Sequence, residues 1–392
     1  MTFRSDPQAL DAADPLARFR AAFVRPDGVL YLCGHSLGAA PKAAADRMAR
    51  AVGEEWAQSL VRGWNSHDWI GAARRVGDRI APLVGAAPGE VIVADSTSVN
   101  LFKLVVAALH AAPERPVVLA LDGEFPTDRY ILEGVLRAVP GARLETGDPA
   151  WMLSRLDADV GVAVASLVDY RTAEVRDMAR FEAAARAAGA SIVWDLSHAA
   201  GAVGVDLNGA GATLAVGCGY KYLNGGPGAP GYLYVAAACQ AGLVSPLQGW
   251  MGHAAPFAFA DAYSPAAGID RFACGTPPIL SLTALECGAA VVAEAGAAAI
   301  AAKTRALVAL FLERAGGGLE LASSAEPDRR GGHVAFRHPD AYAIVQALMA
   351  RGVVGDFRAP DVMRFGFSAL PLSFAEVARA ADLLVEVVET RA

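Results

Sequence analysis

The sequence predicts an α/β protein with a large domain built on a mixed, mainly parallel sheet, and a smaller α+β C-terminal domain. Short β-branched runs alternate with longer helical patterns from about residue 91 to residue 235, which is typical of a doubly wound layer. The runs lack polar alternation, as strands covered on both faces by helices do. A chain of 392 residues also exceeds what one compact core usually fills, so a second unit is expected.

Each element of the large domain has its own signal. Strands are predicted where short apolar runs occur, at 91–95, 117–121, 160–168, 191–195, 213–217 and 231–235. Helices are predicted between them, at 98–112, 126–139 and 178–189. From about residue 280 the sequence is Ala-rich and then mixes short strands with helices, which indicates the smaller domain. The apolar stretch around 288–302 is too short to span a bilayer and predicts a buried or amphipathic helix.

Composition excludes several classes of function. Hydrophobic residues make up 54% of the chain against 19% charged, which argues against disorder. The net charge is -7 with no run of Lys and Arg, so nucleic acid is not an expected partner. The first twenty residues lack an apolar core, so neither export nor a membrane partner is expected. Five cysteines without metal-ligand spacing indicate a reducing cytoplasm and no structural metal.

Lys221 is the first candidate for chemistry. It lies in the glycine-rich segment GCGYKYLNGGPG, residues 217–228, directly after a predicted strand. Glycines allow a bulky group to approach the backbone closely, so Lys221 could form a Schiff base with a carbonyl cofactor. On this segment alone, a surface lysine in a turn is the more common explanation.

Asp195 ends the preceding predicted strand, at the sheet edge where open α/β folds bind ligands. A carboxylate there could pair with the pyridine nitrogen of pyridoxal phosphate (PLP), which keeps the ring an electron sink. Capping of the next helix is the ordinary alternative. His198 could pack beside such a ring or simply satisfy a backbone carbonyl.

Two further strand ends add possible cofactor contacts. Ser96, Thr97 and Ser98 begin a long predicted helix, whose free N–H groups and dipole attract a phosphate. Phe125 and Asp128 follow the next strand, and a ring at that position can stack on a pyridine face. Ordinary capping and an ordinary core Phe remain alternatives for each segment taken alone.

Taken together, these residues indicate a cofactor site far more specifically than any one of them does. Other strand ends contribute Ser166 with Asp169, and Tyr220 with Lys221. All of them fall at the same predicted edge of the sheet, whereas random placement would scatter them. The combination predicts a PLP site.

At this point the sequence resembles the kynureninases, PLP-dependent hydrolases of fold type I in the class-V aminotransferase superfamily. The resemblance covers most of the chain and runs in family order. It rests on GHSLG (34–38), EEW and RGWN (54–65), ADSTSVNLFK (94–103), EFPTD (124–128), DYRT (169–172), WDLSHAAGA (194–202), GCGYKYLNGGPGAP (217–230), GWMGH (249–253), RFACGTPP (271–278) and GDFRAPDVMRFGF (355–367). Class-V aminotransferases and desulfurases share the lysine and the aspartate, but not GWMGH or RFACGTPP.

The resemblance implies a role for each matching residue. Lys221 would hold the cofactor as a Schiff base and act as the base, and Tyr220 would donate or relay a proton. The expected cofactor contacts are Asp195 and His198 at the pyridine, Phe125 stacked on it, Asp128 and Ser166 lining the pocket, and Thr97, Ser98 and Tyr220 at the phosphate. Trp250 and Thr276 would complete the phosphate site of a neighbouring subunit in a homodimer.

For the substrate, the resemblance implies that Arg364 grips the α-carboxylate, and a guanidinium fork suits that task. Ser36 and Trp64 would shape the aryl end. The family usually has Asn before that serine, whereas this chain has His35, which bears on specificity for the aryl ring.

The implied activity is hydrolysis of L-kynurenine, and of 3-hydroxykynurenine in some members, to anthranilate or 3-hydroxyanthranilate and L-alanine in tryptophan catabolism. The expected organisation is an N-terminal segment 1–45 joining the small domain and the active site, a PLP-binding domain 46–279 and a C-terminal domain 280–392. Two alternatives stay open: another class-V enzyme, such as an aminotransferase or a desulfurase using Cys33 or Cys274, and a non-catalytic PLP-binding homologue.

Overall fold

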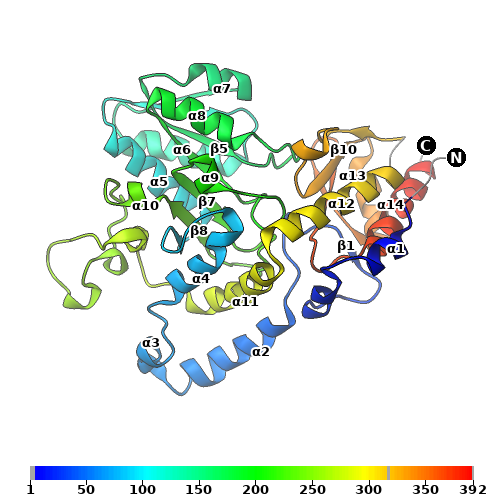
Figure 1. Cartoon of the computed structure of the whole chain (residues 1–392), viewed down its shortest axis with the longest axis horizontal. Coiled ribbons are helices and arrows are strands. Elements are labelled where there is room, and N and C mark those ends of the chain that lie inside the picture. The colour runs from blue at the N-terminus through cyan, green and yellow to red at the C-terminus, as the bar shows by residue number, and fades with distance from the viewer. Residues whose placement is uncertain (1–4, 316–317, 391–392) are drawn as a thin grey trace.

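The large domain is organised around a seven-stranded sheet (Figure 1). The computed structural model describes residues 5–315 and 318–390. The strand order is β2-β8-β7-β6-β5-β3-β4, and only β8 runs antiparallel to its neighbours. The strands are β2 (Val91–Val93), β3 (Val117–Leu121), β4 (Arg143–Gly147), β5 (Val160–Ser166), β6 (Ser191–Asp195), β7 (Leu214–Cys218) and β8 (Gly231–Val235). The predicted mixed, mainly parallel sheet is therefore confirmed.

Both faces of this sheet are buried, as the uninterrupted apolar runs predicted. In β3, Val118 and Ala120 join one apolar cluster, whereas Val117, Leu119 and Leu121 join the cluster on the other face. The covering helices are α5 (Thr97–Ala111), α6 (Pro126–Ala138), α7 (Pro149–Arg155), α8 (Met178–Ala188), α9 (Leu207–Ala210) and α10 (Ala237–Gln240). This burial leaves the carboxyl ends of the parallel strands as the place where polar side chains gather.

The small domain has a four-stranded antiparallel sheet in the order β12-β13-β10-β9. Its elements are α12 (Ala297–Ala315), β9 (Glu320–Leu321), β10 (His333–Arg337), α13 (Ala341–Ala350), β11 (Val353–Val354), β12 (Asp356–Arg358), β13 (Val362–Gly366) and α14 (Phe374–Glu389). Phe311 of α12 lies at the centre of its core, with ring centroids 5.1–6.4 Å from three other rings, those of Phe336, Phe365 and Phe367. These contacts hold α12 against the small-domain sheet.

The N-terminal part of the chain serves both domains. Strand β1 (Leu30–Tyr31) pairs in parallel with β11 of the small domain. Its helices are α1 (Pro7–Ala12), α2 (Lys42–Arg50), α3 (Gly63–Ser66) and α4 (Ala72–Ile80). Helices α2 and α3 extend along one side of the molecule as an arm (Figure 1). Short 3-10 turns occur at 17–22, 60–62, 81–84, 250–252, 256–258, 268–272 and 327–329, and a π-helical turn occurs at 51–56.

The apolar stretch predicted as one helix at 288–302 is instead divided between α11 (Ile279–Ala295) and α12. Gly296 separates the two helices with φ +82° and ψ 138°, a conformation that glycine adopts readily. Within the described residues no helix by itself passes the length and hydropathy test for a membrane span; α11 and α12, bent by 84°, pass it only as a pair. Buried side chains of α11 belong to the large-domain core, and the predicted domain limits stay a prediction.

Candidate active site

The candidate active site forms where the carboxyl ends of the parallel strands face the small domain. Ser166 and Asp195 are the last residues of β5 and β6, and Lys221 follows β7. Thr97 begins α5, and Phe125 directly precedes α6. The sheet edge predicted from the sequence thus brings these residues together.

Lys221 is held through its backbone as well as its side chain. Its Nζ lies 3.1 Å from Nε2 of His198. The neighbouring carbonyl of Tyr220 accepts a hydrogen bond from the N–H of Gly38 at 2.8 Å, and a Cβ at Gly38 would lie 2.2 Å from the Lys221 carbonyl oxygen. The last glycine of the GHSLG motif therefore allows the N-terminal segment to support the lysine loop.

His198 is a neutral neighbour of this lysine. Burial, followed by the positive charge of Lys221, holds the pKa of His198 well below its ordinary value. A neutral imidazole can accept a hydrogen bond from the lysine through Nε2. His198 can thus hold the lysine side chain without adding charge to the site.

Acidic side chains gather on the other side of the site. Asp128 and Asp195 are both more than nine-tenths buried, and burial, then the charges of Asp195 and Glu124, raises the pKa of Asp128 well above its usual range. Oδ2 of Asp128 has no hydrogen-bond partner among the described residues. Such a cluster favours binding of a cationic group, because a nearby positive charge relieves repulsion between carboxylates.

Ser166 and Glu124 support this acidic side. The N–H of Ser166 donates to Oε1 of Glu124 at 2.9 Å, and its hydroxyl donates to Oε2. Burial raises the pKa of Glu124, while Arg176 lies 3.7 Å from it. Ser166 therefore orients a carboxyl group, and no contact in the structure tests its predicted place at the cofactor.

The N-terminus of α5 is the place where the sequence predicts a phosphate cradle. Ser96 is the N-cap and accepts a hydrogen bond from the N–H of Val99 at 3.3 Å, so its hydroxyl serves the helix. Thr97 and Ser98 occupy the first turn and are half-buried. A Cβ at Gly231 would lie 2.7 Å from the Thr97 nitrogen. The start of this 15-residue helix offers free N–H groups and a favourable dipole to an anion.

A buried lysine fixes the loop that precedes this cradle. Asp95 has a left-handed φ of 47°, and its Oδ2 accepts a hydrogen bond from Nζ of Lys103 at 2.8 Å. The same Nζ donates to the Phe272 carbonyl at 2.7 Å. Lys103 thus joins the loop before α5 to the segment that begins at Phe272.

Phe125 lies against Tyr170 with its ring edge-to-face at 5.3 Å. Its side chain is 41% exposed, unlike that of a core phenylalanine. An exposed ring at this strand end is available for stacking on a planar ligand.

Arg364 of β13 forms the small-domain side of the site and is 1% exposed. Its Nε and Nη2 donate to Oδ1 and Oδ2 of Asp356 at 2.8 and 2.6 Å, and its Nη1 donates to the carbonyl of Tyr170. Burial would raise the pKa of Asp356, but its contacts with His35 and Arg364 outweigh burial and hold that pKa far below its usual range. Asp356 is therefore ionised whenever Arg364 is in place.

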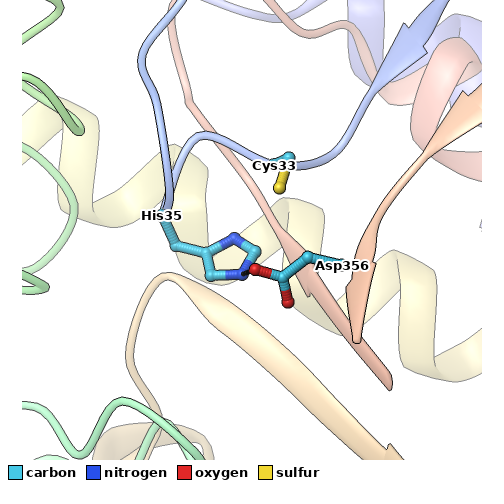
Figure 2. A group of neighbouring side chains, drawn as sticks. All are labelled: Cys33, His35 and Asp356. Atoms are coloured by element: carbon cyan, nitrogen blue, oxygen red, sulfur yellow. Dashed lines mark ion pairs between the residues drawn. The ribbon is translucent and has the colours of Figure 1, made fainter. Parts of the chain in front are cut away.

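The GHSLG segment contacts the same carboxylate (Figure 2). Ser36 Oγ donates to Oδ2 of Asp356 at 2.7 Å, and Nε2 of His35 lies 3.2 Å from the same oxygen, a contact that falls short of a well-formed hydrogen bond. The resemblance placed Ser36 at the aryl end of the substrate. In the structure it adjoins the Arg364 pair, and its role toward the aryl ring stays a prediction.

Cys33, His35 and Asp356 also have the atom types of a metal site, with ligand atoms within 4.8 Å of one another (Figure 2). The carboxylate oxygens, however, are engaged by hydrogen bonds from Ser36 and Arg364. Burial also raises the pKa of the Cys33 thiol to about 11, which disfavours the thiolate that metals prefer. This group is better explained as the support of an arginine fork.

Three further predicted residues have other aromatic or cavity-lining contacts. Trp64 packs edge-to-face on Trp69 at 5.8 Å in the arm, and Trp250 packs on Phe257 at 5.6 Å. Thr276 lines a cavity of about 570 Å³ beside the phosphate end, together with Asp95, Ser96, Tyr220 and Cys274. Their predicted roles, across a subunit interface for Trp250 and Thr276, are not tested by a single chain.

Sequence reasoning gave no role to Asp356 or His333. His333 is fully buried and stacks on His35 with centroids 5.1 Å apart, and its ring lies 5.8 Å from that of His198. Asp356 stands directly opposite Arg364 in the β12–β13 register. The eight-residue separation across a turn containing Pro360 was the available signal for this pair.

Known proteins resemble this chain over its C-terminal part and over its full length. The family model of the kynureninase C-terminal domain matches residues 298–384. The kynureninase of Burkholderia pseudomallei (strain 1106a) is 46% identical over 404 residues, covering 100% of this chain and 97% of that protein. The kynureninase of Pseudomonas fluorescens is 44% identical over 402 residues, with the same coverage.

Solved structures show the fold. The apo cysteine desulfurase of Thermococcus onnurineus NA1 aligns with a TM-score of 0.78 and 17% identity, over 100% of both chains. A C-DES variant with glycine covalently linked to its PLP cofactor aligns with a TM-score of 0.78 and 18% identity, over 94% of this chain and 99% of that one. The predicted fold class, that of the class-V PLP enzymes, is confirmed. The full-length identity to curated kynureninases goes further than the fold and shows that the chain belongs to the kynureninase family.

Proposed function

We propose that this protein is a kynureninase, which hydrolyses L-kynurenine to anthranilate and L-alanine with PLP as its cofactor. The observation that carries the proposal is the junction of Lys221, the buried Asp128–Asp195 cluster and the Arg364 fork in one site. A reactive lysine, a partner for a pyridinium and a partner for an amino-acid carboxylate are the three groups that this reaction requires. The full-length kynureninase relatives support the choice of substrate.

The residues present fit the cofactor. Lys221 would bind it covalently, and Asp195 would pair with the pyridine nitrogen beside the unpartnered Oδ2 of Asp128. Phe125 would cover the ring, while Thr97 and Ser98 would receive the phosphate at the start of α5. When bound, PLP supplies an electron sink for charge that develops at the substrate α-carbon.

The protein groups then move protons and orient the substrate. Arg364 binds the α-carboxylate, which places the α-carbon near the Lys221 amine, and Nζ of Lys221 takes the α-proton. Burial, followed by the charges of Cys218 and Asp195, raises the pKa of Tyr220. Its phenol therefore stays protonated at neutral pH. When water adds to the γ-carbonyl carbon of the substrate and the Cβ–Cγ bond breaks, that carbon becomes the carboxyl group of anthranilate, and the phenol can donate a proton to the departing alanyl carbon.

A desulfurase activity is less well supported. It needs a reactive thiolate, and burial raises the pKa of Cys33 to about 11. The desulfurase structures that align with this chain are 17% identical, so their likeness concerns the fold alone.

We also propose a cytoplasmic homodimer in which Trp250 and Thr276 reach the partner's phosphate site. Large apolar side chains exposed on one chain support an interface, among them Trp56, Leu60, Val61 and Phe259. The five free cysteines fit a reducing compartment. Mixing inactive Lys221→Ala with a weakly active Trp250→Ala variant should restore activity, because one site of a mixed dimer would be intact. Absence of restoration in mass-verified mixed dimers would contradict shared sites.

The activity is tested by incubating the PLP-loaded protein with L-kynurenine and following anthranilate fluorescence. Lys221→Ala should lose turnover by several orders of magnitude and should no longer be labelled by PLP and borohydride. Lys42→Ala, which removes an exposed lysine of α2, is the matched control. Full turnover by Lys221→Ala would refute the mechanism, whereas borohydride labelling without anthranilate formation would refute only the substrate.

A further inference from the structure

Asp356 holds Arg364 along one edge of its guanidinium. The two residues are cross-strand partners in β12 and β13, so their side chains leave the sheet on the same face. The two hydrogen bonds, at 2.8 and 2.6 Å, use Nε and Nη2. This is the bidentate geometry in which a carboxylate fixes the plane of an arginine.

The remaining N–H groups of Arg364 define where a second anion can bind. A guanidinium has five N–H groups, and three are used by Asp356 and the Tyr170 carbonyl. One N–H on Nη1 and one on Nη2 are left. These adjacent nitrogens match the two oxygens of one carboxylate, so a second carboxylate can bind while Asp356 stays in place.

Asp356 is itself firmly held. Its Oδ2 accepts from Ser36 at 2.7 Å and lies 3.1 Å from Nη2 of Arg358 and 3.2 Å from Nε2 of His35. His35 is closely packed, because it stacks on His333 and a Cβ at Gly366 would lie 2.0 Å from its Nδ1. These contacts argue that Asp356 is a fixed support and not a carboxylate that substrate displaces.

We infer that Asp356, held by Ser36 and His35, is a positioning residue that orients Arg364 so that its free Nη1 and Nη2 hydrogens receive the α-carboxylate of the substrate. The inference rests on the proposed function for the role of Arg364. If Asp356 has this role, the GHSLG segment helps to bind the substrate carboxylate, in addition to supporting the lysine loop. It also explains how a histidine can stand in this motif, because its ring still contacts Asp356.

The test compares two ligands that differ only in the carboxylate. L-Alanine and L-alaninamide are titrated against the PLP-loaded enzyme, and the change in cofactor absorbance gives the Kd of each. Asp356→Asn should weaken L-alanine by about tenfold or more, the size expected for loss of a hydrogen bond to a charged group. The Kd of L-alaninamide should change less than about twofold, because no carboxylate reaches Arg364.

Asp382→Asn is the matched control. Asp382 forms the same fork with Arg314, at 2.9 and 2.7 Å, between α14 and α12, and its loss should leave both Kd values unchanged. Ser36→Ala removes one support of Asp356 from a partly exposed position. It should weaken L-alanine selectively by about threefold, a smaller loss because the other contacts of Asp356 remain.

Equal weakening of both ligands would show a merely structural role for Asp356 and overturn the inference. An unchanged Kd of L-alanine in Asp356→Asn would also overturn it, because Asp356 would then have no role in binding the carboxylate. A lower Kd would overturn it as well, because Asp356 would then compete with the substrate for Arg364. The binding of either ligand is measured without any cleavage of kynurenine. Failure of the proposed activity would therefore appear separately, as missing anthranilate in the wild-type protein.

Discussion

His35 provides a test of how the buried site responds to pH. It is fully buried, and burial lowers its pKa from 6.5 to about 4. The nearby charged or titratable side chains are Asp356, Arg364, Lys221, Cys33, His198 and His333. At pH 5 the imidazole is neutral in the folded protein but protonated in the unfolded chain. The free energy of unfolding therefore falls as pH drops from about 6.5 toward 4.

The size of the effect follows from the two pKa values. At pH 5 the unfolded chain binds nearly one proton more at this position than the folded protein, and this difference builds up as the pH falls from 7. At about 1.4 kcal/mol per pKa unit, this costs the folded state about 2 kcal/mol over the interval. His35→Asn removes the titrating group, so its free energy of unfolding should fall by about 2 kcal/mol less than that of the wild type over the same interval.

The assay is urea unfolding of both proteins at pH 7 and pH 5, followed by tryptophan fluorescence and circular dichroism. The change between the two pH values is compared, so any constant effect of the substitution cancels. His110→Asn removes an exposed imidazole at the end of α5 and serves as the control. If the free energy of unfolding fell equally between pH 7 and pH 5 in the wild type and in His35→Asn, His35 would not be the titrating group and the prediction would be wrong.

Three further predictions concern the supports of the site. Gly38→Ala should push on the Lys221 carbonyl, 2.2 Å from the added Cβ, and should weaken PLP retention on dialysis while the far-ultraviolet circular dichroism stays unchanged. Lys103→Met should leave Asp95 without its buried partner, lowering the free energy of unfolding by about 2 kcal/mol and weakening PLP binding; stability loss with normal PLP affinity would contradict a role at the phosphate loop. Phe311→Ala should cost about 3–5 kcal/mol in urea unfolding, because it empties the centre of the small-domain core.

Apolar patterns predicted the large-domain sheet well because most of its strands are buried on both faces. Strand β4 was missed, since this edge strand reads RLETG and is largely half-exposed, so it lacks the apolar run that marks the others. The bend at Gly296 was missed for a similar reason. An Ala-rich stretch with one glycine reads as a single helix unless the tertiary packing on each side is known.

The candidate site shows the same difference between residues that the sequence predicts and residues that it does not. Lys221, Asp195 and the start of α5 follow strands in sequence, so the rule that ligands bind at the carboxyl edge locates them. Asp356 was missed because its importance arises from pairing with Arg364 across two antiparallel strands and with Ser36, 320 residues away. The contact with Ser36 leaves no periodic trace in one sequence, and the short β12–β13 turn becomes informative only once the two strands are known to pair.

The parallel pairing of β1 with β11 joins the beginning of the chain to its last third. During synthesis the GHSLG segment leaves the ribosome first, yet its partners in the small domain are made some 320 residues later. The large-domain sheet can form in the interval, whereas the segment that carries Gly38 gains its pairing with β11 only through a late loop closure. We expect nascent chains released before β11 to contain a folded sheet and an incomplete lysine loop, so that competence to retain the cofactor is acquired only as the C-terminus is finished.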